Sequence, residues 1–383
     1  MKSILHIGKF YPPFFGGIEN FMAELLPACQ QLGTKQSALV HNTELIRSVE
    51  EIDGVTIYRS ARLGLLMFAP ISPWFLSDLH SAMDEQTPDI LHIHMPNLSA
   101  FWLLLSHKAR KVPWIVHWHA DVVGDRPKWF IKLFYPFYRV FERAILKRAK
   151  MVICTSPHYR DSSSPLLSYS DKLCVVPLGL HAVSPAENNS SVVCRAASPI
   201  IKVLVVGRLS YYKGHSVLFS ALSELPVELR KKVEVKVVGI GELEQQLSDM
   251  LKSLELDNVT MLGQVSSEEI NPLYDWCDLI CLPSIERTEA FGLVILEAAR
   301  QSKPALVTDV HGSGMSWVVE DKSTGWVVES NNADALSSQL TEIIQQPGQC
   351  ITFGGLAYKR FAKKFSINSV AQEITDVYYS CSL

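Results

Sequence analysis

Two cations lie in one short loop in the second half of the chain. Arg208 and Lys213 belong to the segment GRLSYYKG, which follows IKVLVVG, an apolar run typical of a buried strand. In open α/β sheets ligands bind where such strands end, and positive side chains there suit a diphosphate. The alternative is an ordinary solvated loop, and this segment alone does not decide between the two.

Two carboxylates follow in the segment SIERTEAFGLVILEAAR. We expect Glu289 just before a helix that opens near Phe291, with Glu297 eight positions after Glu289. At ~1.5 Å per residue, the second carboxylate lies up to ~12 Å from the first. One acid could then bind a sugar and the other a ribose, while the first-turn amides at Phe291, Gly292 and Leu293 favour a pyrophosphate between them. For a lone pair of glutamates, ordinary helix-start and surface acids are the simpler explanation.

Apolar runs must position these residues, and they alternate with helical patterns in both halves of the chain. The runs are KSILHIG, ILHIH, WIVHWH, MVICTS and KLCVVPLGL, then IKVLVVG, VKVVG, VTMLG, DLICLPS and PALVTD. This alternation predicts parallel strands joined by crossover helices. The polar, turn-rich stretch 184–199 is the best linker candidate. We therefore expect an α/β protein with doubly wound, Rossmann-like domains at 1–185 and 186–362, followed by a C-terminal helix at 363–383.

Composition agrees with two globular domains. The chain has 383 residues, of which 48% are hydrophobic and 20% charged, so a disordered or fibrous protein is excluded. The net charge of -3 gives no reason to expect nucleic acid as a partner. Eight cysteines without a Cys-x-x-Cys pair favour a reducing cytosol and no metal site. The apolar stretches are shorter than the ~20 residues of a membrane span, and no signal peptide is evident, so we expect a cytoplasmic protein.

Taken together, the motifs closely resemble family 4 of the retaining glycosyltransferases, which have the GT-B fold. The resemblance rests on EAFGLVILEA and GRLSYYKG, and on FYPPFFGGIE, HIHMPN, VHWHAD, VVPLGL, VGIGELEQQL and MLGQVSSEEI. It covers nearly the whole chain. It implies two Rossmann-like domains facing a central cleft, the first binding the acceptor and the second the nucleotide sugar. The C-terminal helix would cross back to the first domain.

The resemblance also assigns roles to the residues of the second half. It implies that Arg208 and Lys213 neutralise the leaving diphosphate, that Glu289 contacts the donor sugar, and that Glu297 binds the ribose. The other expected donor contacts come largely from the backbone, at Gly17, Val265, Phe291, Gly292 and Leu293. In VVGIGELEQQL the third glycine of a dinucleotide fingerprint is missing, so a tight turn beside the nucleotide is expected instead.

In the first half, the resemblance points to the loops after two strands. Gly16 and Gly17 would let the backbone approach the acceptor and the donor phosphate closely, although a plain tight turn explains them too. His119 matches the family's active-site histidine. We expect His117 to alternate away from His119 and face the other side of the sheet. Asp121 is expected to orient this loop or bind the acceptor, with a capping role as the alternative.

The segment 126–150 combines eight basic residues, one acid and seven aromatic residues. This composition is typical of an interfacial helix on an anionic membrane, and a lipid-linked acceptor would explain it. The alternative is a core helix with its aromatic face on the sheet and its cations in water. In either case, we expect Pro136 to interrupt the helix.

These inferences predict a metal-independent, retaining hexosyltransferase without a cofactor. It would use a nucleotide sugar, with a lean to GDP-mannose over UDP-hexoses, and a saccharide or lipid-linked acceptor in lipopolysaccharide, O-antigen or other surface polysaccharide synthesis. No Asp-x-Asp motif occurs, which agrees with metal independence. A non-catalytic nucleotide-sugar-binding subunit, a nucleotide-sugar epimerase and an NAD-dependent oxidoreductase are the competing interpretations.

Overall fold

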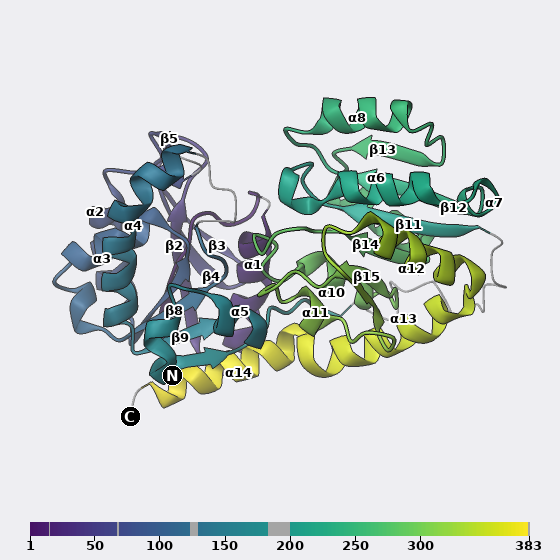
Figure 1. The fold of residues 1–383 in the computed structure, drawn as a ribbon. Helices are drawn as coiled ribbons and strands as arrows, with labels where there is room; N and C mark the ends of the chain where they lie inside the picture. Colours follow the sequence, from purple (N-terminus) through teal and green to yellow (C-terminus); the bar gives the residue numbers. More distant parts are fainter. Residues whose placement is uncertain (15, 67–68, 123–128, 183–199, 382–383) are drawn as a thin grey trace. The chain divides into compact units, whose positions relative to one another are not determined.

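The computed structural model describes residues 1–14, 16–66, 69–122, 129–182 and 200–381 (Figure 1). The chain divides into two compact units. The first unit comprises Met1–His181 with Ser366–Leu383, and the second comprises Ala182–Phe365. The sequence placed these boundaries at residues 185 and 362, and the expected linker at 184–199 lies outside the described residues.

The first unit is built on an eight-stranded sheet with the order β10-β9-β8-β7-β1-β2-β4-β3 (Figure 1). Its strands are β1 (Ser3–Ile7), β2 (Lys35–His41), β3 (Ser48–Ile52), β4 (Val55–Ser60), β7 (Ile90–Met95), β8 (Trp114–Trp118), β9 (Met151–Cys154) and β10 (Leu173–Val175). All neighbours are parallel except the edge pair of β3 and β4. A small separate hairpin joins β5 (Gly64–Leu66) to β6 (Ala69–Ile71). Because the chain reverses its strand order at β1, β7 and β1 form a topological switch point.

The helices of the first unit include the last one of the chain. They are α1 (Gly17–Gln31), α2 (Phe75–Gln86), α3 (Trp102–Leu105), α4 (Trp129–Arg148), α5 (Pro157–Ser162) and α14 (Ile367–Ser380). The backbone N–H of Ile367 donates to the carbonyl of Leu180, and α14 packs against α1, where the Cys29 Sγ lies 3.9 Å from the Ala371 carbonyl oxygen. The expected return of the C-terminal helix to the first domain is confirmed.

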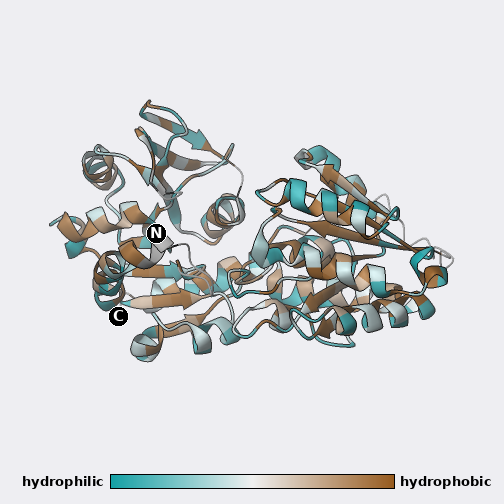
Figure 2. Ribbon diagram, turned by 45° about the horizontal axis from the view of Figure 1, so that its top comes forward, coloured by the Kyte–Doolittle hydropathy of each residue, from teal (hydrophilic) through white to brown (hydrophobic). Residues whose placement is uncertain are grey.

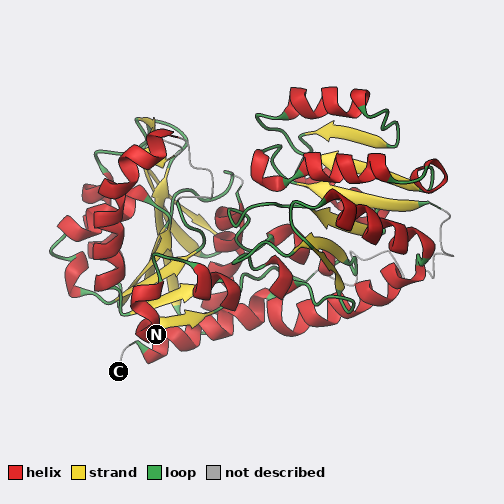
Figure 3. Cartoon of the chain, in the orientation of Figure 1, coloured by secondary structure: helices red, strands yellow, loops and turns green. Residues whose placement is uncertain are grey.

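The second unit has a six-stranded, all-parallel sheet with the order β13-β12-β11-β14-β15-β16. Figure 3 shows its strands in yellow with helices around them. Its strands are β11 (Ile201–Val206), β12 (Val233–Val238), β13 (Val259–Gly263), β14 (Leu279–Leu282), β15 (Ala305–Thr308) and β16 (Gly325–Val328). Its helices are α6 (His215–Glu224), α7 (Val227–Arg230), α8 (Glu244–Ser253), α9 (Ser267–Trp276), α10 (Leu293–Ala299), α11 (Met315–Val318), α12 (Ala333–Gln345) and α13 (Gly348–Arg360). The strand order reverses between β11 and β14, which makes their carboxyl ends the second switch point.

Hydrophobic strands covered by amphipathic helices form the cores of both units (Figure 2). In the second unit the apolar run of β11 places Val203 and Leu204 wholly inside, and the Trp326 ring of β16 is buried with them. The sequence did not predict β2, because its first residues, KQS, are polar. It also did not predict β4 or β16.

The helix expected to break at Pro136 does not break. α4 runs continuously from Trp129 to Arg148 with Pro136 inside it, so the prediction of an interruption is wrong. Proline removes one backbone donor and one hydrogen bond, but this ring lies on the exposed side of the helix, where water can satisfy the freed carbonyl. Among the described residues, no helix has the length and apolarity needed to cross a membrane.

Candidate active site

In the second unit, the loops after β11 and β14 bring a lysine and a glutamate together. The Lys213 Nζ lies 2.5 Å from Oε2 of Glu289, and the two side chains are 14% and 12% exposed. Lys213 ends the short helical turn after β11, and Glu289 lies in the loop after β14. The structure therefore places two sequence-predicted site residues in contact at a switch point, where open α/β sheets bind their ligands.

The charges around Lys213 keep it protonated. Burial acts to lower its pKa, but the Glu289 carboxylate, aided by Tyr212 and Glu297, outweighs burial and raises the pKa of Lys213 above its ordinary value. A permanent, largely desolvated cation at this position can stabilise an anionic ligand such as a diphosphate.

Gly214 holds the two loops together. It has φ 69°, a left-handed conformation, and an added Cβ would lie 1.9 Å from the Pro283 carbonyl oxygen. The Ile285 N–H also donates to the Tyr212 carbonyl at 2.8 Å. Only a glycine permits this close approach without strain, so the fold sets the Lys213–Glu289 contact through the backbone as well as through charge.

Glu297 lies on α10 and is anchored from another helix. The buried Tyr274 hydroxyl of α9 donates a hydrogen bond to the Glu297 Oε2 at 2.5 Å. Burial, and then the adjacent Glu297 carboxylate, raise the pKa of Tyr274 well above its usual range, so it remains a donor. The second oxygen of Glu297 is not engaged in this bond and can accept from a ligand hydroxyl.

The helix after Glu289 starts later than expected. α10 begins at Leu293, two residues after Phe291, and has seven residues. The reason is Gly292, whose φ of 78° is left-handed and cannot continue an α-helix backward. Phe291 is buried against the ring of Phe365 and anchors the loop, leaving the backbone of Gly292 and Leu293 at the helix start.

Arg208 and Val265 lie at the ends of β11 and β13. The Arg208 guanidinium pairs with Glu242 at 3.1 Å, and both side chains are more than half exposed. Gly239 packs against the backbone of residue 207 so closely that an added Cβ would lie 2.0 Å from its carbonyl oxygen. Val265 is partly exposed and immediately precedes Ser266, the N-cap of α9.

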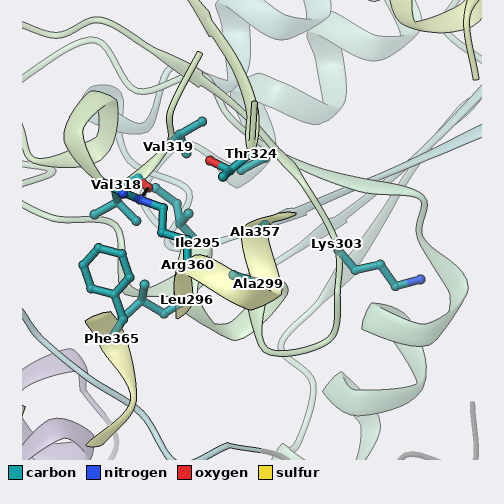
Figure 4. Close-up of a pocket in the computed structure, with 11 residues that line it drawn as sticks. Ile295, Leu296, Ala299, Lys303, Val318, Val319, Thr324, Ala357, Arg360 and Phe365 are labelled. Atoms are coloured by element: carbon teal, nitrogen blue, oxygen red, sulfur yellow. Dashed lines mark hydrogen bonds between the residues drawn. The ribbon is translucent and has the colours of Figure 1, made fainter. Parts of the chain in front are cut away.

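A small cavity lies behind α10, and it is too small for a nucleotide sugar. Its volume is ≈ 10 Å³, about the space of one water molecule, and it separates α10 from Arg360 and Phe365 (Figure 4). The Arg360 guanidinium there donates to the carbonyls of Trp317 and Val318. This cavity belongs to the packing that supports α10.

In the first unit, Gly16 and Gly17 begin α1 at the end of the loop after β1. An added Cβ on Gly16 would lie 2.2 Å from a carboxylate oxygen of Glu19, whereas around Gly17 there is open space to 4 Å. Burial raises the pKa of Glu19 and lowers that of Lys9, and the opposite charges of the two residues act against both shifts. Gly17 therefore leaves room for a ligand, and Gly16 accommodates a buried carboxylate.

The sequence predicted that His119 and His117 face opposite sides of the sheet, but the structure places the two rings side by side. Their rings stack with centroids 4.2 Å apart, so the prediction that they face opposite sides is wrong. The physical reason is the period of a strand: residues one apart alternate, but residues two apart share a face. The same rule places His92 and His94 of β7 side by side, with ring centroids 4.7 Å apart.

A cluster of five buried histidines results, formed by His6 of β1 with these two pairs. Sequence reasoning missed it, although HIH and HWH on neighbouring strands were a visible signal. Burial lowers the pKa of His6 to about 4 and that of His119 to about 3, so the rings are neutral at neutral pH. Two groups of three have their ligand atoms within 4.8 Å of one another, at His6, His92 and His94, and at His94, His117 and His119. Neutral imidazoles are competent metal ligands, but here their nitrogens contact one another at hydrogen-bond distances.

Asp121 follows His119 and is held firmly by its surroundings. Its Oδ1 accepts from the Trp118 indole at 2.9 Å and from the Ser163 hydroxyl at 2.7 Å. These bonds fix the Asp121 carboxylate against Trp118 and Ser163, and its role at the acceptor stays a prediction. Sequence reasoning also missed Glu142 of α4: burial and the nearby Asp121 raise its pKa to about 7.

Two linked comparisons define the class of protein. The family model "Glycosyl transferase 4-like domain" matches residues 16–179, and "Glycosyl transferases group 1" matches residues 196–360. A crystal structure of Anabaena HepE in complex with UDP-glucose has a TM-score of 0.71 with this chain at 18% identity, covering 98% of this chain and 99% of that one. The two doubly wound units are therefore those of a GT-B fold.

The chain belongs to the family 4, group 1 glycosyltransferases. The O-antigen chain mannosyltransferase C of Escherichia coli is 27% identical over 379 residues, which cover 98% of this chain and 97% of that protein. The D-rhamnosyltransferase WbpZ of Pseudomonas aeruginosa is 27% identical over 375 residues, covering 95% of this chain and 92% of that protein.

Proposed function

We propose that this glycosyltransferase moves a hexosyl group from a nucleoside diphosphate sugar to a saccharide or lipid-linked acceptor in bacterial surface polysaccharide synthesis. The Lys213–Glu289 pair at the β11/β14 switch point carries the proposal, because it joins a cation for a diphosphate to a carboxylate for sugar hydroxyls. The similarity to an O-antigen mannosyltransferase supports the pathway and a lean toward GDP-mannose as the donor.

In the proposed mechanism, negative charge develops on the departing diphosphate. Lys213 and Arg208 stabilise that charge, and the backbone amides of Gly292 and Leu293 add donors fixed in advance. Glu289 holds the sugar and Glu297 the ribose. We infer retention of the anomeric configuration, with a leaving-phosphate oxygen accepting the proton of the acceptor hydroxyl on the same face.

A panel of nucleotide sugars tests this function. We expect GDP-mannose to raise the melting temperature and to be consumed only when a lipid-linked saccharide acceptor is added. Binding without turnover on any acceptor would favour the non-catalytic subunit. Conversion of the sugar without an acceptor would favour the epimerase.

Transfer is expected to persist in excess EDTA. Lys213 and Arg208 supply the positive charge that a divalent cation would otherwise supply to the diphosphate. Initial rates with and without chelator, on protein first passed over a chelating resin, make the comparison. Complete loss of transfer that magnesium restores would contradict the role given to the two side chains.

Helix α4 is proposed to contact the anionic cytoplasmic face of the inner membrane. Its exposed apolar side chains are Leu133, Phe134, Phe137, Val140 and Phe141. Arg143 and Lys147 are exposed on the same helix and can bind lipid phosphates. Part of the aromatic face of α4 packs within the first unit instead, because the ring of Phe141 also stacks on that of Phe101.

Sedimentation with lipid vesicles tests this contact. We expect binding to phosphatidylglycerol vesicles, weakened by salt, and a roughly tenfold loss of binding in Phe137→Ser because one aromatic ring leaves the membrane. Val227→Ser is the matched control, since Val227 is an exposed apolar residue of the second unit. Equal binding by both variants would rule out α4 as the contact.

A further inference from the structure

A chain of hydrogen bonds crosses the sheet of the first unit and ends at His119. The Gln36 Oε1 of β2 lies 2.8 Å from the His6 Nε2 of β1. The His6 Nδ1 lies 2.9 Å from the His94 Nε2 of β7, and the His94 Nδ1 lies 2.9 Å from the His119 Nε2. All four side chains are buried, so each hydrogen bond is made away from water.

Gln36 determines which atoms donate and which accept along this series of hydrogen bonds. The Thr34 hydroxyl donates to the Cys29 carbonyl at 2.6 Å, so its oxygen can accept. It accepts from the Gln36 side-chain amide at 2.7 Å. The amide nitrogen therefore faces Thr34, and the carbonyl oxygen of Gln36 is left to accept from His6.

The direction then passes from ring to ring. A neutral imidazole has one N–H donor and one acceptor nitrogen, so the donor role of one atom assigns the other. With Nε2–H donating to Gln36, His6 accepts at Nδ1 from the Nε2–H of His94. His94 in turn accepts at Nδ1 from the Nε2–H of His119. The His119 Nδ1 is left with a lone pair and, within the described parts of the chain, has no hydrogen-bond partner.

We infer that Gln36, His6 and His94 are positioning residues that hold His119 as its Nε2–H tautomer and present its Nδ1 as an acceptor for a sugar hydroxyl. The hydroxyl's role rests on the proposed function, but the tautomer does not. The opposite direction would set two lone pairs against each other between Gln36 and His6 and would leave a buried N–H at His119. Because the opposite direction loses one buried hydrogen bond, we expect its population to be lower by about tenfold or more.

The arrangement of the rings favours hydrogen bonds over a shared metal ion. The rings of His94 and His119 are nearly parallel, at 12°, as are those of His92 and His94, at 6°. The ring nitrogens of His6, His94 and His119 already meet in pairs at 2.9 Å, a hydrogen-bond distance. His92 and His117 form a branch that meets the relay at His6, because the Tyr378 hydroxyl lies 2.7 Å from the His92 Nδ1 and 3.4 Å from the His6 Nε2. If this hydroxyl donates to His92, its oxygen can accept from the Nε2–H of His6, so the branch agrees with the same direction.

Nitrogen NMR of the histidine rings tests the tautomer without substrate. Two-bond 1H–15N spectra distinguish a protonated from an unprotonated ring nitrogen. We expect a single form of His119 in the native chain, protonated at Nε2, and a mixture of tautomers in Gln36→Leu. Gln36→Glu keeps an acceptor oxygen and should restore the single form. An unchanged His119 spectrum in Gln36→Leu would overturn the inference.

Two further variants separate direction from packing. Thr34→Val removes the hydroxyl that orients Gln36, four hydrogen bonds from His119, and should also give mixed tautomers. This variant provides the test if Gln36→Leu does not fold. His117→Phe is the matched control, because His117 stacks on His119 but lies outside the chain of bonds. It should leave the tautomer of His119 unchanged. A shift as large as that in Gln36→Leu, or zinc bound stoichiometrically to these rings, would refute the relay.

Kinetics link the tautomer to the proposed function. We expect Gln36→Leu to lower kcat/KM for the donor sugar by about twofold to tenfold, in proportion to the fraction of His119 in the wrong form. Affinity for the free nucleoside diphosphate should not change, because His119 would contact the sugar. A native chain that shows the single tautomer but no transfer would count against the proposed function and leave the relay intact.

Discussion

Glu289→Gln is expected to slow sugar transfer by about 100-fold or more while the second unit stays folded. Glutamine has the same shape and can still accept a hydrogen bond from Lys213, but it lacks the negative charge that holds the sugar hydroxyls and balances Lys213. Glu289→Ala should lose transfer too and should also lower the melting temperature, because it leaves a largely buried ammonium without its partner.

Measuring kcat, KM and melting temperature together distinguishes these effects. Glu320→Gln is the control, since Glu320 pairs with Arg360 elsewhere in the same unit and has no assigned contact with the donor. We expect near-native transfer from it. If Glu289→Gln kept near-native transfer, the role assigned to Glu289 would be rejected. The Lys213–Glu289 contact would then no longer support the proposed function.

The first unit is expected to lose stability steeply as the pH falls below about 6.5. Burial lowers the pKa of His6 to about 4 and those of His41 and His119 to about 3, and it holds those of His92, His94 and His117 well below the ordinary 6.5. Between the ordinary and the lowered values, the unfolded chain binds protons that the folded unit does not. The free energy of unfolding therefore falls with falling pH, by up to about 1.4 kcal/mol per pH unit for each histidine.

Urea unfolding between pH 7.5 and pH 4, about the range of this titration, measures the slope. His41→Phe should reduce it by about one proton, because it replaces a buried ring that stacks on Phe75 without adding a titrating group. The native slope should exceed that of the variant between the ordinary histidine pKa of 6.5 and about pH 4. Equal slopes would mean that His41 is already protonated in the folded unit.

The sequence predicted the fold class and the elements that carry Lys213 and Glu289. Strand patterns placed both residues in loops after strands, but local patterns could not show that β11 and β14 are neighbours. The pairing of β11 with β14, and the close contact of Gly214 with Pro283, depend on residues that are far apart in the sequence. The predicted roles of the site residues remain proposals.

The histidine cluster shows the limit of local reasoning in another way. Residues two apart on a strand share a face, so the spacing within HIH and HWH was sufficient to place His92 with His94 and His117 with His119. The prediction for His117 and His119 was wrong because it treated them as alternating. The direction of the hydrogen bonds could not be predicted, since it depends on Thr34 and Gln36 meeting His6 across separate strands. In α4, the exposed position of Pro136 overrode its local preference.

The return of α14 to the first unit has a consequence for biosynthesis. The Tyr378 ring is completely buried and bonds to His92, so this part of the first unit is completed only when α14, which follows the second unit in sequence, packs onto it. A ribosome synthesises α14 only after the whole of the second unit. The first unit must therefore wait until the second unit has been translated, and a nascent chain stopped before α14 would expose the apolar surface of α1 to chaperones and proteases.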